Sequence, residues 1–121
     1  MPQKNRQYVL SPYTIHTYNR GLHLYPNYEI VVLEGVVVSG ITNLSLEIKN
    51  SSGSGNIVSV IIYGSPDGID YFVLDNELFP SKITPGQLVH EEFTVVTKFI
   101  RVTVEATENI IMDIHLHGIT V

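Results

Sequence analysis

Apolar and polar residues alternate with a period of two through most of the chain from residue 28 to residue 121. The clearest case is the segment 43–49, where Leu44, Leu46 and Ile48 alternate with polar residues. Because successive side chains of a strand point to opposite faces, this pattern predicts a strand with one buried and one wet face. No stretch keeps the i, i+3, i+4, i+7 apolar spacing of an amphipathic helix, so we predict no helix.

Short strands separated by Gly, Pro, Asn and Ser are expected along this part of the chain. Their ranges are 28–38, 43–49, 57–63, 71–74, 88–96, 99–106 and 110–121. In the first range Glu34 and Gly35 mark an expected bend or bulge. Residues 65–68 read Ser-Pro-Asp-Gly, which is typical of a tight turn because Pro fixes φ and Gly accepts a positive φ. The spacing predicts one all-β domain, a jelly-roll-like β-sandwich, and an open barrel fits the same pattern.

The N-terminal segment differs from the rest of the chain. Residues 8–10 and 13–18 have strand composition, but they are short and are flanked by Pro12 and by the tripeptide 19–21, Asn-Arg-Gly. They form either an edge strand of their own domain or an extended arm that adds to the exposed sheet edge of a neighbouring subunit. We favour the arm, and divide the chain into an arm at 1–20 and a sandwich at 21–121. The expected subunit-contact residues are Lys4, Arg6, Tyr8, Val9, Leu10, Tyr13, Ile15 and Tyr18.

Charge is divided unevenly along the chain. Lys4, Arg6 and Arg20 are the only charged residues before Glu29, so residues 1–28 carry about +3 with histidine neutral. Residues 29–121 contain the remaining four basic residues and all twelve acidic residues, so they carry −8. Together with the +3 of residues 1–28, this gives the net charge of −5. A basic arm on an acidic body is complementary to another copy of the same body. Net negative charge also argues against nucleic acid as the partner.

Candidate chemistry is sparse. Asp113, His115 and His117 lie at i, i+2 and i+4 of an expected strand and therefore on one face, where two imidazoles could bind a metal. We favour a solvent-facing row, so no metal and no other cofactor is predicted, and these three residues are the best candidates if a metal binds. The chain has no cysteine and none of the usual nucleophile or phosphate-binding motifs, so no enzyme is predicted.

Two features of the sequence bear on where the protein acts: the length of its apolar runs and the composition of its N-terminal residues. No apolar run approaches the ~20 residues of a membrane-spanning helix, so we expect no membrane insertion. No apolar segment of signal-peptide length follows the first basic residues, so the route of export is left open. Five of the seven tyrosines lie in the first 28 residues. They could serve as interface anchors, form a platform on which sugars stack, or simply pack as ordinary strand aromatics.

Four stretches carry a resemblance to a known family: 62–68 (IYGSPDG), 83–86 (ITPG), 98–104 (KFIRVTV) and 112–118 (MDIHLHG). They resemble an uncharacterised β-sandwich family of spore-forming Firmicutes. More loosely, the order of arm, strands and closing strand is similar to that of endospore-appendage subunits. That resemblance implies jelly-roll domains that polymerise by strand complementation through N-terminal arms. In that family cysteines link the arm to neighbouring subunits, and a chain without cysteine cannot do so.

We therefore expect a structural subunit that assembles with copies of itself into a filament or surface layer. It would act on a spore or cell surface as an extracellular, pilus-like fibre. Two alternatives stay open: a carbohydrate-binding β-sandwich that uses loop ends and tyrosines, and a phage or virus-like structural protein.

Overall fold

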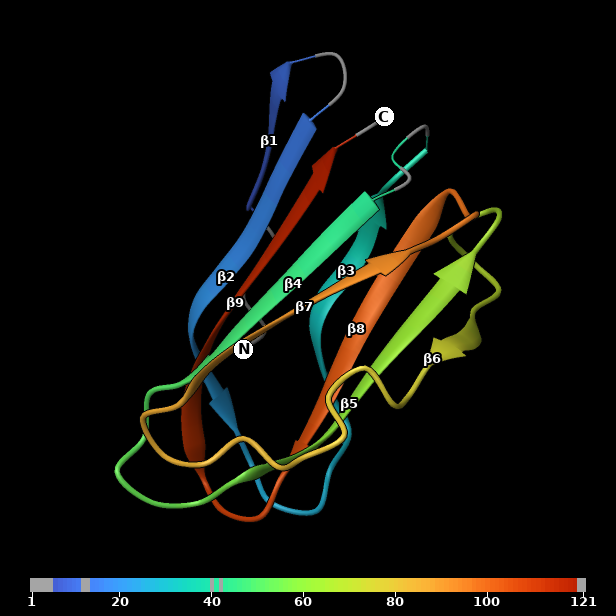
Figure 1. The fold of residues 1–121 in the computed structure, drawn as a ribbon. Coiled ribbons are helices and arrows are strands. Elements are labelled where there is room, and N and C mark those ends of the chain that lie inside the picture. The colour runs from blue at the N-terminus through green and yellow to red at the C-terminus, as the bar shows by residue number, and fades with distance from the viewer. Residues whose placement is uncertain (1–5, 12–13, 40, 42, 120–121) are drawn as a thin grey trace.

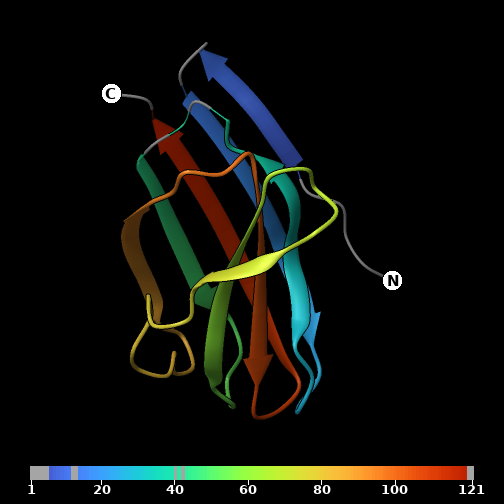
Figure 2. The ribbon, with the colours of Figure 1, turned by 90° about the vertical axis from the view of Figure 1, so that its right-hand side faces the viewer.

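The computed structural model describes residues 6–11, 14–39, 41 and 43–119. Within these ranges the chain forms nine strands and no helix. The strands are β1 (Arg6–Ser11), β2 (Thr14–Leu24), β3 (Ile30–Val37), β4 (Asn43–Asn50), β5 (Ile57–Ser65), β6 (Phe72–Asp75), β7 (Leu88–Thr94), β8 (Phe99–Ala106) and β9 (Ile110–Ile119). They pack as two layers (Figure 1; Figure 2). The predicted all-β sandwich is confirmed.

The strand order is that of a jelly roll with one strand added. Sheet A has the order β1-β2-β9-β4-β7 and sheet B the order β3-β8-β5-β6, and every pairing within them is antiparallel. Without β1, each sheet has four strands, and consecutive strands of the chain alternate between the sheets from β2 to β9 except at the β5–β6 hairpin. This is the double Greek key of a jelly roll. β1 extends the β2 edge of that eight-stranded unit.

The core lies between the two sheets and follows the alternation in the sequence. The predicted inward residues Leu44, Leu46 and Ile48 of β4 are buried, as are Ile100 and Val102 of β8. Each large apolar side chain that is taken out of water contributes about 1.5–3 kcal/mol to folding. Between β6 and β7 the connection sends Ile83 into the core, where its backbone N–H and C=O bond to Ile57 at 2.8 Å and 3.0 Å.

Among the places where the strand register shifts, two have a glycine at positive φ. In β3 the register with β8 shifts between Leu33 and Val36, and Gly35 has φ 60°. This is the bend expected at Glu34 and Gly35. In β2 the register with β9 shifts between Asn19 and Leu22, and Gly21 has φ 63°. A glycine adopts this conformation without the steric cost of a Cβ.

The second bulge changes the interpretation of the N-terminal segment. β2 runs without a break from Thr14 to Leu24, so the boundary expected at residue 20 falls inside a strand. β2 is hydrogen-bonded to β1 on one side and to β9 on the other, within its own sheet. The segment 14–20 is therefore part of the sandwich, and among the described strands only β1 lies outside the eight-stranded jelly roll. The tripeptide at 19–21 looked like an end of the strand because bulges and turns both favour glycine.

Candidate functional site

Polar and aromatic side chains cover the outer face of sheet A. In a sheet, residues directly opposite each other on neighbouring strands share a face. One such row pairs Ser45 of β4 with His117 of β9 and His117 with His16 of β2. The next row pairs Glu47 with His115 and His115 with Tyr18. All five histidines of the chain lie on strands of this sheet: His16, His23, His90, His115 and His117.

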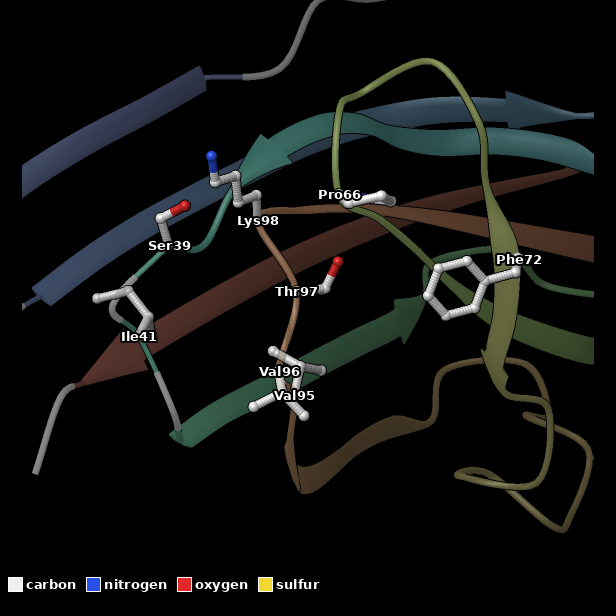
Figure 3. A pocket seen from close by; sticks show the side chains of 8 residues that line it. All are labelled: Ser39, Ile41, Pro66, Phe72, Val95, Val96, Thr97 and Lys98. Carbon is white, nitrogen blue, oxygen red and sulfur yellow. The ribbon is translucent and has the colours of Figure 1, made fainter.

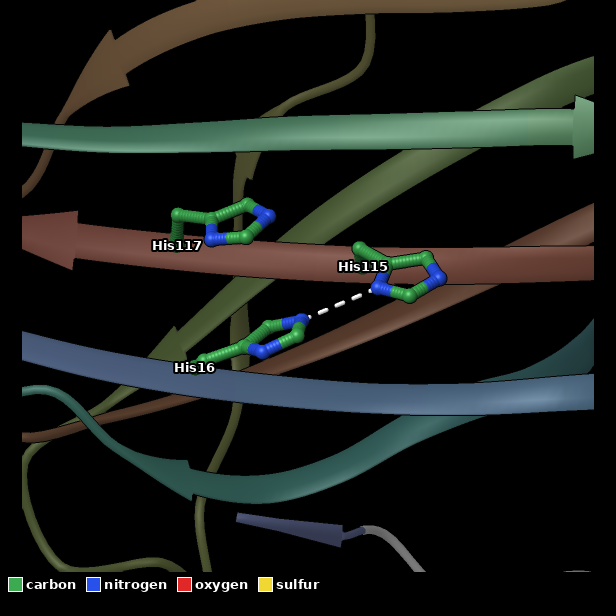
Figure 4. Close-up of side chains that lie close together, drawn as sticks. All are labelled: His16, His115 and His117. Carbon is green, nitrogen blue, oxygen red and sulfur yellow. Dashed lines mark hydrogen bonds between the residues drawn. The ribbon is translucent and has the colours of Figure 1, made fainter. Parts of the chain in front are cut away.

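Three of these histidines form a compact cluster. Their candidate ligand atoms, one ring nitrogen from each, all lie within 4.8 Å of one another. Nε2 of His16 is hydrogen-bonded to Nδ1 of His115 at 2.9 Å, across the β2–β9 pair (Figure 4). The rings of His16 and His117 stack, with centroids 4.3 Å apart and 11° between their planes. Two neighbouring strands thus hold three imidazoles against one another.

Tyr18 and Arg20 extend the cluster along β2. The Tyr18 ring stacks on His115 with centroids 5.4 Å apart. The guanidinium carbon of Arg20 lies 4.8 Å from the centre of the Tyr18 ring, a distance typical of a cation–π contact. Tyr18 is therefore packed between the histidines and Arg20.

The surroundings of His16 and His115 favour the neutral form of both rings over the charged form. Burial lowers the pKa of His16, and charge on His117, His115 and Arg20 would lower it further. Burial also lowers the pKa of His115, with Arg20 the next cause, while Glu47 acts in the opposite direction. A neutral imidazole has one nitrogen lone pair free to accept a hydrogen bond or to bind a metal.

The structure differs in one residue from the row of Asp113, His115 and His117 that the sequence predicted on one strand face. His115 and His117 do lie together on β9, as their spacing predicted. The Asp113 carboxylate is used elsewhere, because its Oδ1 accepts a hydrogen bond from the backbone N–H of Gly21 at 2.8 Å. His16 takes the third place in the cluster. It is 99 residues away from His115 in the chain, and no local pattern connects the two.

The second candidate site is the pair of edges of sheet A. β1 and β7 are its terminal strands, at opposite sides of the sheet (Figure 1). β7 carries exposed Glu91 and Glu92, and its first residue, Leu88, is 58% exposed. β1 begins with Arg6. The two edges of one sheet thus differ in the sign of their charges.

An open groove of about 580 Å³ lies beside the end of β7 (Figure 3). It is lined by Ser39, Ile41, Pro66, Phe72, Val95, Val96, Thr97 and Lys98. Val96 is fully exposed and Phe72 is half exposed. Exposed apolar side chains therefore lie beside the C-terminal end of β7.

The expected subunit-contact residues divide into three groups. Lys4 and Tyr13 lie outside the described residues. Arg6, Tyr8, Val9 and Leu10 belong to β1. Ile15 and Tyr18 belong to β2, where the Ile15 side chain is buried in the core and Tyr18 packs against His115. Ile15 is thus a core residue, and Glu91 and Glu92 of β7 are contact candidates that no local sequence pattern reveals.

Comparisons with known proteins give no family for the chain. No family model matches it, and no curated protein matches its sequence. Among solved structures, a Bacillus endospore appendage described as forming disulfide-linked pili aligns over 100% of this chain and 96% of its own, with 11% identity and a TM-score of 0.48. The N-terminal cellulose-binding domain of Cellulomonas fimi β-1,4-glucanase C aligns over 91% and 78%, with 12% identity and a TM-score of 0.46.

A third solved structure is a CBM32 module from a family 31 glycoside hydrolase of Clostridium perfringens. It aligns over 87% of this chain and 76% of its own, with 16% identity and a TM-score of 0.43. The appendage subunit expected from the sequence is thus one of several similar folds, and a Firmicute family stays a prediction. No helix in the described part of the chain has the length and apolar character needed to cross a bilayer.

Proposed function

We propose that the protein is a structural subunit that assembles head to tail, with β1 of one copy pairing along β7 of the next. The observation that carries the proposal is that these two strands are the opposite edges of the same sheet. An edge strand presents main-chain N–H and C=O groups that can bond to another strand. Pairing the edges would continue sheet A from one copy to the next. We place such a fibre on the surface of a spore or a cell.

Charge favours this pairing over its alternatives. β7 presents Glu91 and Glu92, so two β7 edges repel each other. The first 28 residues carry about +3 with Arg6 inside β1, so a β1 edge attracts β7. Acidic edge residues are also a common protection against aggregation. Acidic residues on an edge repel another acidic edge, but they still allow that edge to pair with a basic one.

The geometry gives an open polymer. The two edges are different surfaces, so each contact leaves one free β1 and one free β7, and assembly does not close as a symmetric dimer would. A five-stranded sheet with strands ~4.8 Å apart advances about 24 Å per copy along the hydrogen-bonding direction. A twist of about 20–25° per strand would turn each copy by about 100–125° relative to the previous one.

Charge reversal tests the proposal most directly. The double variant Glu91→Lys/Glu92→Lys makes both edges basic, and Arg6→Glu makes both edges acidic. We expect each variant alone to remain monomeric in analytical ultracentrifugation under conditions in which the natural chain forms fibres. An equimolar mixture should form fibres again, because each variant supplies the edge that the other lacks. The matched control is Asp70→Lys/Glu77→Lys, which makes the same charge change in exposed residues outside β7.

The proposal is wrong if the natural chain stays monomeric at high concentration, or if the mixture of the two variants fails to assemble while both are folded. Deleting residues 1–20 would be a poor test, because it removes more than half of β2. Deleting 2–12 removes β1 and leaves the eight strands of the jelly roll. We expect that shorter chain to be a folded monomer.

A second candidate function, carbohydrate binding, is favoured by two exposed tyrosines. Tyr25 and Tyr28 lie in the connection between β2 and β3 and are 59% and 68% exposed. Exposed aromatic rings at loop ends are suited to stack on sugars. A glycan array with the monomeric Arg6→Glu variant separates the two functions. Saturable binding that is lost in Tyr25→Ala/Tyr28→Ala would support carbohydrate recognition, and the absence of any such binding would leave the structural role alone.

A further inference from the structure

We propose that His16, His115 and His117 together bind one divalent transition-metal ion, with Zn²⁺ as the reference ligand. The site lies on the outer face of sheet A and is formed within a single chain. It does not depend on the β1 or β7 edges, so it stands or falls independently of the proposed assembly.

The two strands place the ligands in advance. His16 and His117 are direct register partners across β2 and β9, and His115 is two residues away from His117 on the same strand. Side chains at such positions share a face and approach closely. Nε2 of His16 and Nδ1 of His115 are already 2.9 Å apart, and the three candidate ligand atoms span at most 4.8 Å. In a tetrahedral zinc site with Zn–N distances of about 2.0–2.1 Å the nitrogens lie about 3.3 Å apart.

The three ring nitrogens can reach the spacing of a zinc site by rotation of their side chains, without movement of the backbone. The backbone of β2 and β9 is fixed by their mutual hydrogen bonds and by β4 on the far side of β9. The rings stack with planes 9–20° apart and face solvent at His117, so they can turn toward a common centre. Sites built on strands of a sheet hold their ligands more rigidly than loop sites. Three protein ligands leave a fourth position open for water.

The donor set selects the class of metal. Three imidazoles suit Zn²⁺, Cu²⁺ and Ni²⁺, whereas Ca²⁺ and Mg²⁺ prefer oxygen ligands. The chain has no cysteine, so no thiolate competes for the ion. Glu47 lies opposite His115 in the register and supplies a negative charge beside the cation.

The experiment is calorimetric titration of the full, untagged chain with ZnCl₂ near neutral pH. We expect one ion per chain for the natural protein. His16→Ala, His115→Ala and His117→Ala should each weaken binding at least about tenfold, because two imidazoles hold zinc far less well than three. The matched controls are His23→Ala and His90→Ala. These histidines lie on the same sheet and are exposed, but they are outside the cluster, so their removal should leave the affinity unchanged.

A measurement on the natural chain covers the case in which a variant fails to fold. In a ¹H–¹³C spectrum of the histidine rings, Zn²⁺ should shift the resonances of His16, His115 and His117 and leave those of His23 and His90 in place. The proposal is overturned if the five rings respond equally or not at all. It is also overturned if the control variants lose affinity as much as the cluster variants, or if zinc binds only between two copies at half an ion per chain.

Discussion

The backbone N–H of Gly21 donates a hydrogen bond to Oδ1 of Asp113, 92 residues further along the chain, at 2.8 Å. Gly21 stands at φ 63°, in the bulge that shifts the register of β2 against β9. The carboxylate binds the backbone of the bulge at the one place where the ladder is irregular. This contact allows β2 to continue to Leu24, whose side chain is buried in the core.

Gly21→Ala should destabilise the protein by about 1–2 kcal/mol, the cost of a left-handed conformation for a residue with a Cβ. A Cβ at this position would meet nothing within 4 Å, so backbone strain is the whole effect. Gly53→Ala is the control, because a Cβ there also meets nothing and Gly53 has no positive φ. Urea unfolding followed by circular dichroism measures both. Equal stability of the two variants would contradict the role given to the bulge.

Thr17→Val should stabilise the protein by about 1 kcal/mol. The Thr17 side chain is fully buried, and the structure gives its hydroxyl no hydrogen-bond partner within the described ranges. Valine has the same shape and removes the buried polar group. Thr103→Val is the matched comparison, because the buried Thr103 donates to Oε2 of Glu29 at 2.7 Å and should lose stability on substitution. Thermal unfolding of both variants should give shifts of opposite sign, and a lower midpoint for Thr17→Val would refute the argument.

Glu29 should make the stability of the protein depend on pH in the acid range. Hydrogen bonds from the Tyr63 hydroxyl and from Thr103 lower the pKa of Glu29 below its ordinary value of 4.5. Because the pKa is lower in the folded state, this stabilisation is complete above pH 4.5 and is lost as the pH falls through the folded-state pKa. In Glu29→Gln the free energy of unfolding should therefore fall less between neutral and acid pH. Parallel pH profiles for the two proteins would show that Glu29 contributes nothing.

Arg101→Lys should lower the free energy of unfolding by about 0.5–1.5 kcal/mol, and this loss should be largest at low salt concentration. The Arg101 guanidinium makes two hydrogen bonds to Glu34, at 2.8 Å and 2.9 Å, and lies 3.9 Å from the centre of the Tyr71 ring. Lysine keeps the charge but cannot form the paired bonds or the planar stack. The exposed Lys82 provides a control, since Lys82→Ala should change stability little. The loss of the ion pair is not the cause of the effect if added salt leaves the difference in unfolding free energy between Arg101→Lys and the natural chain unchanged.

Most of the fold could be predicted from local pattern. The alternation at 43–49 corresponds to β4 (Asn43–Asn50), and the expected strand at 99–106 corresponds to β8 (Phe99–Ala106). These predictions succeed because an antiparallel sheet with one buried face imposes a period of two on its sequence. The C-terminal end of β2 could not be predicted, because the tripeptide Asn-Arg-Gly at 19–21 can either end a strand or form a bulge. Only its partner Asp113, far along the chain, decides between the two.

The candidate site divides in the same way. His115 and His117 were found together because they lie two residues apart on one strand. His16 was missed because its place beside them depends on which strands pair, and β2 meets β9 across almost the whole length of the chain. Glu91 and Glu92 likewise could not be predicted as contact residues from the sequence, because only the strand order shows that β7 is an edge strand of sheet A.

The central position of β9 has a consequence for the order of folding. β9 lies between β2 and β4, so the N-terminal hairpin β1–β2 has no ladder to the β4–β7 pair until β9 is inserted. Closing such distant contacts is slow, because the entropy of a long loop is lost before any bond forms. During that interval β2 and β4 each present an unpaired side to other molecules. We expect refolding yield to fall with protein concentration, through mispaired chains that form before β9 is in place.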